Sequence, residues 1–122
     1  MASRSTFPIE SLERCPVMIA GSFKPNSTSA LVASETKGKG FTAARSGVGT
    51  FTITCDDTFP DLLSVIATLR LNTVGDQYVQ PVSFASKVLT LKIVDASSGA
   101  AVDIAHNANN VVSFMCMFKN AS

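Results

Sequence analysis

The fold class is decided by one stretch of the chain, Phe41-Thr42-Ala43-Ala44-Arg45-Ser46-Gly47-Val48-Gly49-Thr50-Phe51-Thr52-Ile53-Thr54-Cys55. Its second half alternates strictly, with Phe51, Ile53 and Cys55 opposite three threonines, which is the period of a half-buried β-strand. The two glycines between the halves supply the positive φ values that a tight connection needs. The stretch therefore predicts a β-hairpin with a glycine turn, whose threonine face meets water or a polar partner.

Further strand-like segments lie on both sides of this hairpin. They are residues 15–23, 62–72, 77–84, 88–94 and 111–118, with a weak edge strand around residues 31–33. In residues 62–72 the alternation places Leu63 on the same side as Val65, and only Ile66 breaks the pattern. A helix is the competing interpretation of this segment, because several of its apolar residues also fit a period of 3.6.

The last of these strands is apolar on both faces. Val112, Phe114, Cys116 and Phe118 alternate with Val111, Met115 and Met117, and only Ser113 is polar. A strand of this kind needs cover on both sides. We expect one face to meet the core and the other to meet a second sheet or a second subunit.

Length and composition agree with a small β protein. The chain has 122 residues, of which 46% are hydrophobic and 16% charged. This length predicts one domain, and abundant Thr and Val with scarce Glu and Gln favour strands over helices. We expect an all-β fold, a single antiparallel β-sandwich or barrel-like domain over residues 15–122, preceded by an extended N-terminal arm over residues 1–14.

The arm carries apolar side chains that it cannot bury by itself. Phe7, Ile9 and Leu12 stand there beside charged residues such as Arg14. We therefore expect the arm to dock on its own domain, on a neighbouring subunit or on another protein.

The charge balance limits the possible partners. A net charge of +1 excludes a protein that holds nucleic acid by a broad basic field. The apolar runs are too short for a membrane helix, and the first residues lack the apolar core of a signal peptide. Lys24, Lys37, Lys39 and Arg45 could gather on one side, where they would make at most a local phosphate or acidic-surface contact.

Neither metal nor cofactor chemistry is indicated. Cys15, Cys55 and Cys116 are widely spaced without a second ligand type, which favours buried reduced thiols, although one disulfide among the three is an alternative. The aspartates at residues 56–61 are typical of a turn, with a calcium site as the less favoured interpretation. The glycines of residues 38–49 lack phosphate-loop spacing. We expect no metal and no cofactor.

A hydrolase would have to use His106, the only histidine, with Asp103 as its orienting partner. No nucleophile signature accompanies the pair, and the segment is loop-like. We therefore expect no catalytic residue and a non-enzymatic protein.

The remaining class of function is binding to another protein or to a second copy of the chain. Uncommitted apolar groups occur in the arm, in the last strand and along the edge at residues 78–84, and together they predict an oligomer or a docked protein. The candidate interface residues are Phe7, Ile9, Leu12, Arg14, Tyr78, Phe84, Val112, Phe114 and Phe118.

Several stretches resemble small virion structural proteins of tailed bacteriophages. They are Ala20-Gly21-Ser22-Phe23, Lys37-Gly38-Lys39-Gly40-Phe41-Thr42, Arg45-Ser46-Gly47-Val48-Gly49-Thr50-Phe51-Thr52-Ile53, Phe59-Pro60-Asp61-Leu62, Ala105-His106-Asn107-Ala108-Asn109-Asn110-Val111-Val112-Ser113-Phe114 and Phe118-Lys119-Asn120. Size, arm and β-rich body are most similar to head decoration, or cement, proteins.

This resemblance implies a protein that is made in the host bacterial cytoplasm and then clamps onto the major capsid protein at the capsid surface, often as a homotrimer. The alternative is a small tail or fibre-tip module that binds a host surface through the loops at residues 27–38 and 101–110. The chain has no long fibrous region, which departs from typical tail fibres.

Overall fold

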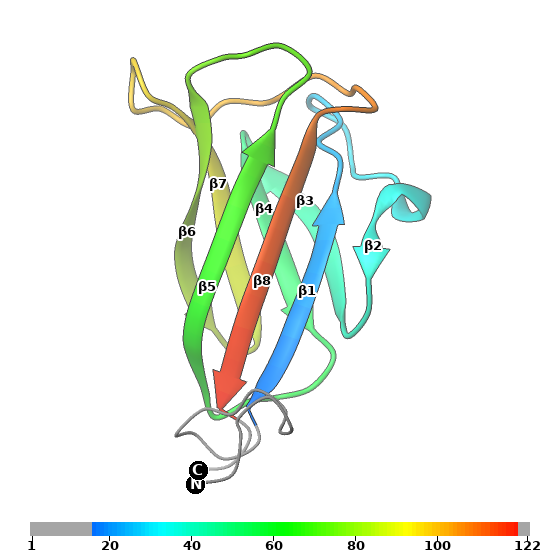
Figure 1. Ribbon diagram of the computed structural model, residues 1–122, viewed down its shortest axis with the longest axis vertical. Coiled ribbons are helices and arrows are strands. Elements are labelled where there is room, and N and C mark those ends of the chain that lie inside the picture. The colour runs from blue at the N-terminus through cyan, green and yellow to red at the C-terminus, as the bar shows by residue number, and fades with distance from the viewer. Residues whose placement is uncertain (1–15, 120–122) are drawn as a thin grey trace, which may run out of the picture.

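A computed structural model describes residues 16–119, which form two four-stranded antiparallel sheets packed face to face (Figure 1). The sheet orders are β2-β1-β8-β5 and β3-β4-β7-β6. The elements are β1 (Val17–Phe23), the 3-10 turn η2 (Ala33–Glu35), β2 (Lys37–Gly38), β3 (Phe41–Gly47), β4 (Thr50–Cys55), β5 (Asp61–Arg70), β6 (Gln77–Ala85), β7 (Val88–Asp95) and β8 (Val111–Lys119). The antiparallel β-sandwich is confirmed, and the sheets do not close into a barrel.

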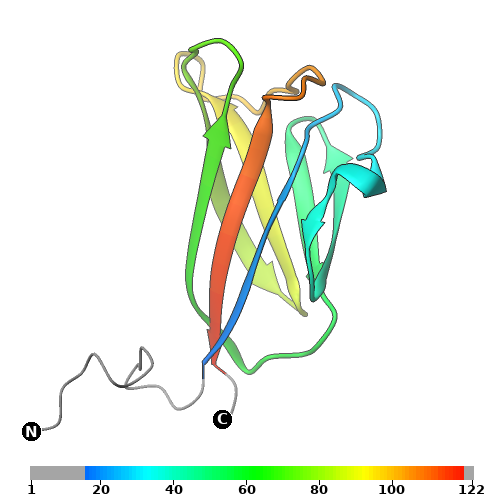
Figure 2. The same ribbon diagram turned by 45° about the vertical axis from the view of Figure 1, so that its right-hand side comes forward.

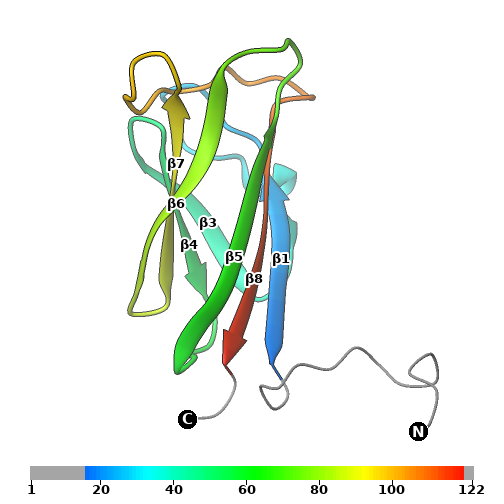
Figure 3. The same cartoon turned by 60° about the vertical axis from the view of Figure 1, so that its left-hand side comes forward.

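The core fills the space between the two layers, which Figures 2 and 3 show from the side. Aromatic rings join the sheets across this space. Phe23 of β1 lies 5.0 Å from Phe51 of β4, measured between ring centroids. Phe118 of β8 stacks on Phe59 at 4.6 Å and packs against Phe84 of β6 at 5.4 Å. Burial of these rings, together with the aliphatic side chains of the core, stabilises the packing of the two layers.

The hairpin of residues 41–55 forms as predicted, and Phe51, Ile53 and Cys55 are buried. One detail of the expectation is wrong. Of the two glycines in the turn, only Gly49 has a positive φ, of 55°. Gly47 instead lies beside a bulge that follows Arg45. The bulge adds the residue that the turn needs, so a single left-handed glycine is sufficient.

Two other expectations need correction. No strand forms at residues 31–33, where the chain instead turns through η2 into the two-residue strand β2. In β5 a bulge between Leu62 and Ser64 reverses the alternation, so Leu62 packs on the core and Leu63 is 40% exposed. A bulge changes which side chains face inward, and alternation alone does not reveal it.

Phe41 closes the side of the sandwich between β1 and β3. Its ring meets Phe114 edge to face at 4.8 Å. A Cβ atom on Gly21 would collide with the same ring and lie 2.5 Å from the Lys37 carbonyl oxygen. Glycine at position 21 therefore makes room for the aromatic ring, which is one reason for a glycine within a strand.

The two described cysteines, Cys55 and Cys116, are buried and free, as expected for them. Burial raises the pKa of the Cys116 thiol to about 11, so this thiol stays protonated at neutral pH. Cys15, the N-terminal arm and its residues Phe7, Ile9, Leu12 and Arg14 lie outside the described residues, and their roles stay predictions.

Gly49 lies where three segments meet. Its carbonyl oxygen accepts a hydrogen bond from the Ile93 N–H at 2.8 Å, and its own N–H donates to the Asp103 carboxylate at 2.9 Å. A Cβ atom here would collide with the Val102 carbonyl oxygen and lie 2.9 Å from the Ile93 carbonyl oxygen.

Gly49→Ala should lower the free energy of unfolding by about 2–4 kcal/mol, because it combines a positive φ with a clash against backbone atoms. Urea denaturation followed by circular dichroism measures this loss. The matched control is Gly99→Ala, whose φ is 70° but whose added Cβ meets nothing within 4 Å. Equal losses in the two variants would mean that the close backbone contact at Gly49 does not exist.

Candidate interaction surface

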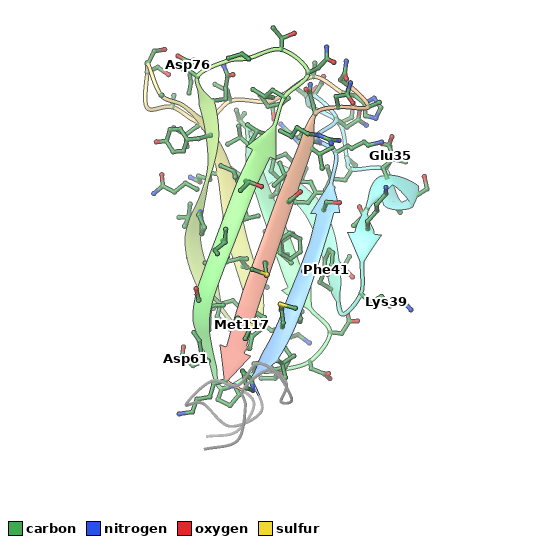
Figure 4. All side chains as sticks on the ribbon, viewed as in Figure 1. Glu35, Lys39, Phe41, Asp61, Asp76 and Met117 are labelled. Carbon is green, nitrogen blue, oxygen red and sulfur yellow. The ribbon has the colours of Figure 1, made fainter. Side chains whose placement is uncertain are left out.

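The outer face of the β2-β1-β8-β5 sheet carries exposed apolar side chains. In the cross-strand register Met18 pairs with Met117, and Ala20 and Ile66 both pair with Met115. Met18 is 58% exposed, Ile66 55% and Met115 40%. We call these five residues the methionine patch. Figure 4 labels Met117 on β8. Met117 lies toward one end of the sheet, and Glu35 lies near the other end.

The other sheet presents a different outer face. There Thr42 pairs with Thr54, and Thr52 pairs with both Ala44 and Thr90. The threonine side chains meet water at little cost, since each carries a hydroxyl group, and Ala44 adds only a methyl group. On the sheet built around β8 the exposed apolar residues lie on three adjacent strands, whereas those of the other sheet, Tyr78 and Val82, lie on its edge strand β6.

A polar pocket occupies the other half of the outer face that carries the methionine patch. Ser22, Ser113 and Thr68 form its floor as cross-strand neighbours on β1, β8 and β5. The remaining lining residues are Lys24, Glu35, Lys37, Arg70, Ala108 and Val111. The pocket has a volume of about 430 Å³, which is in the range of small-molecule sites.

Charged groups on two loops meet at this pocket. The carboxylate of Glu35 lies 2.8 and 2.9 Å from Nε2 of His106, and 3.8 Å from Nζ of Lys24. Within residues 16–119, neither Lys37 nor Arg70 is part of an ion pair. The lining therefore carries more positive than negative charge.

Asp103 does not orient His106, as the disfavoured hydrolase alternative would have required. It accepts hydrogen bonds from Nε of Arg45 at 3.2 Å and from Nη2 at 3.0 Å, in addition to the one from Gly49. This bidentate pair is partly buried and ties the 101–110 loop to the hairpin. His106 instead pairs with Glu35, so its environment is that of a loop histidine.

The predicted gathering of four cations is only partly found. Lys24 and Lys37 line the pocket, whereas Arg45 is held by Asp103 and Lys39 is not among the lining residues. Arg70 joins them from β5. Arg70 was not predicted to join these cations, because strand pairing rather than sequence proximity brings it to this place.

The structure corrects part of the predicted interface. Val112, Phe114 and Phe118 are buried in the core, so a surface partner cannot reach them. Phe84 packs against Phe118, whereas Tyr78 is exposed on the edge strand β6. The alternation correctly placed Val112, Phe114 and Phe118 on one face of the last strand, but that face is buried. The opposite face, which carries Met115, is the exposed one.

Within the described residues there is no helix long and apolar enough to cross a membrane. In the same part of the chain no three His, Cys, Asp or Glu side chains lie close enough together to hold a metal ion. Comparisons with protein-family models, with curated proteins and with solved structures find no match for the chain.

The Arg45–Asp103 pair makes stability depend on pH. Hydrogen bonds from Arg45 lower the pKa of Asp103 below its usual 3.8, so the ionised form is favoured in the folded state. Because this pKa is lower in the folded state than in the unfolded state, the ionised Asp103 stabilises the fold at pH values above 3.8. The stabilisation is lost as the pH falls through the pKa of the folded state.

Asp103→Asn should therefore lower the free energy of unfolding by about 2 kcal/mol at neutral pH, because charged hydrogen bonds from Arg45 and Gly49 are lost. The difference from wild type should shrink once pH falls below 3.8. Urea denaturation at several pH values measures both effects, with Asp57→Asn in an exposed turn as the control. A loss that stays constant down to the lowest pH would contradict this role of the Asp103 charge.

Proposed function

We propose that the protein is a non-enzymatic structural protein of a tailed-phage virion, of the head decoration type. The single observation that supports this best is the methionine patch, where exposed apolar side chains of three adjacent strands lie side by side. Exposed apolar patches of this kind mark association surfaces. The sequence resemblance supplies the virion context.

The patch suits a homotrimer with the outer face of β8 toward a threefold axis. β8 lies between β1 and β5, so Met115 occupies the middle of the patch with Met18 and Ile66 on either side. Each copy then packs one side of its patch against the other side of a neighbour's patch, as cyclic symmetry requires. Methionine side chains adapt readily to such a contact.

Like charges limit the contact to this half of the sheet. The pocket half carries Lys37 and Arg70, and close approach of these cations between copies would cost energy. The methionine half is therefore the part that becomes buried in the trimer, while the pocket half stays open to solvent.

Attachment to the capsid is assigned to residues 1–14. Phe7, Ile9 and Leu12 supply apolar contacts to the major capsid protein after shell expansion creates the site. Three arms on one trimer add avidity, because the second and third binding events are intramolecular.

The two loops that meet at the polar pocket favour a second candidate function. Glu35 lies in the 27–38 loop and His106 in the 101–110 loop, and they are in direct contact. A tail or fibre-tip module that binds a host surface would use this end of the molecule.

Sedimentation velocity should find a trimer for the wild-type protein and a monomer for Met115→Glu, because a carboxylate in the middle of the patch cannot be buried without a partner. The same two proteins are then sedimented with expanded and with unexpanded capsids of a phage that encodes the chain. We expect the wild type to bind expanded shells selectively and the variant to bind them weakly, through one arm.

Thr52→Glu on the opposite outer face is the matched control and should behave as wild type in both steps. A monomeric wild type would overturn the assembly proposal. A trimer that ignores capsids but binds host cells would replace the head assignment with the tail module.

A further inference from the structure

We propose that the polar pocket binds a sugar of monosaccharide size that carries a phosphate or carboxylate group. The inference concerns the half of the sheet that the methionine patch does not use. It therefore holds whether or not the protein decorates a capsid.

Two cations without an ion-pair partner in the described residues supply the anion site. Lys37 stands on β2 and Arg70 on β5, the two outer strands of the sheet, so they face the pocket from opposite sides. A guanidinium group suits two-point binding of a carboxylate or phosphate, and an ammonium group adds a point charge. Lys24 adds a third positive charge, which the nearby Glu35 partly offsets.

Hydroxyl recognition comes from the floor of the pocket. Ser22, Ser113 and Thr68 lie side by side on three adjacent strands, and each hydroxyl can both donate and accept a hydrogen bond. Glu35 offers carboxylate oxygens as further acceptors on one wall, where His106 holds it in place. Donors and acceptors in one row fit a ligand with several hydroxyl groups.

The volume of the pocket favours a sugar derivative over a simple anion as its ligand. A phosphate ion would leave most of the 430 Å³ empty, whereas a hexose derivative fits such a volume. Ala108 and Val111 add small apolar surfaces to the lining, against which the carbon face of a sugar ring can pack. The pocket therefore offers a contact for each part of an acidic sugar.

The test is a titration of the full-length, ¹⁵N-labelled protein, followed by NMR spectroscopy. The ligands are glucose 6-phosphate and glucuronic acid, with glucose and inorganic phosphate as comparators. We expect one or both acidic sugars to shift the amide signals of Ser22, Thr68 and Ser113. The glucose and inorganic phosphate titrations should give at most weak, unsaturated shifts.

Arg70→Gln should weaken binding of the acidic sugar by about tenfold or more, because a charged hydrogen-bond donor is lost. Lys37→Gln is the second variant and should act in the same direction. Lys92→Gln, on β7 of the other sheet, is the matched control and should bind as wild type. The spectrum of each variant without ligand establishes that it is folded.

Three results would overturn the proposal. The first is the absence of shifts with either acidic sugar. The second is inorganic phosphate binding as tightly as glucose 6-phosphate, which would make the pocket a simple anion site. The third is unchanged binding in both folded variants. None of these results depends on the oligomeric state or on capsid binding, so the two proposals fail separately.

Discussion

The structure depends on the alternation of side chains along β8. Val112, Phe114 and Phe118 point inward and are almost completely buried, whereas Met115 points outward. Since β8 pairs with both β1 and β5, its register decides which residues of those two strands face solvent. A slip of one residue would expose the aromatic rings and bury the outer row, so the hydrophobic effect fixes the register strongly. The core and the candidate interaction surface are thus two sides of one strand.

Much of the fold could be predicted from the sequence, because half-buried strands alternate visibly. The hairpin at residues 41–55 and the inward row of β8 are of this kind. The bulge after Leu62 could not be predicted, because the added residue leaves no mark of its own in the pattern of apolar residues. The same alternation indicated that one face of the last strand would be free, but the interface prediction placed residues of the buried face in it.

The candidate site was less predictable because it depends on contacts between distant segments. Glu35 and His106 are separated by 71 residues, and strand pairing brings them within 2.8 Å of each other. Ser22, Thr68 and Ser113 have no common motif and become neighbours only through sheet order β1-β8-β5. One sheet face therefore offers two different surfaces, an apolar one suited to permanent association and a cationic one suited to a small anionic ligand.

In the proposed assembly the methionine patch, which is exposed in the single chain, is covered by neighbouring copies. The rate at which hydrogen peroxide oxidises Met18, measured by mass spectrometry of peptides, shows whether the patch is covered. We expect slow oxidation of Met18 in the wild-type protein and fast oxidation in Met115→Glu, since the Met18 side chain is 58% exposed when no second copy covers it. Equally fast oxidation in both proteins, at concentrations where the wild type is oligomeric, would contradict it.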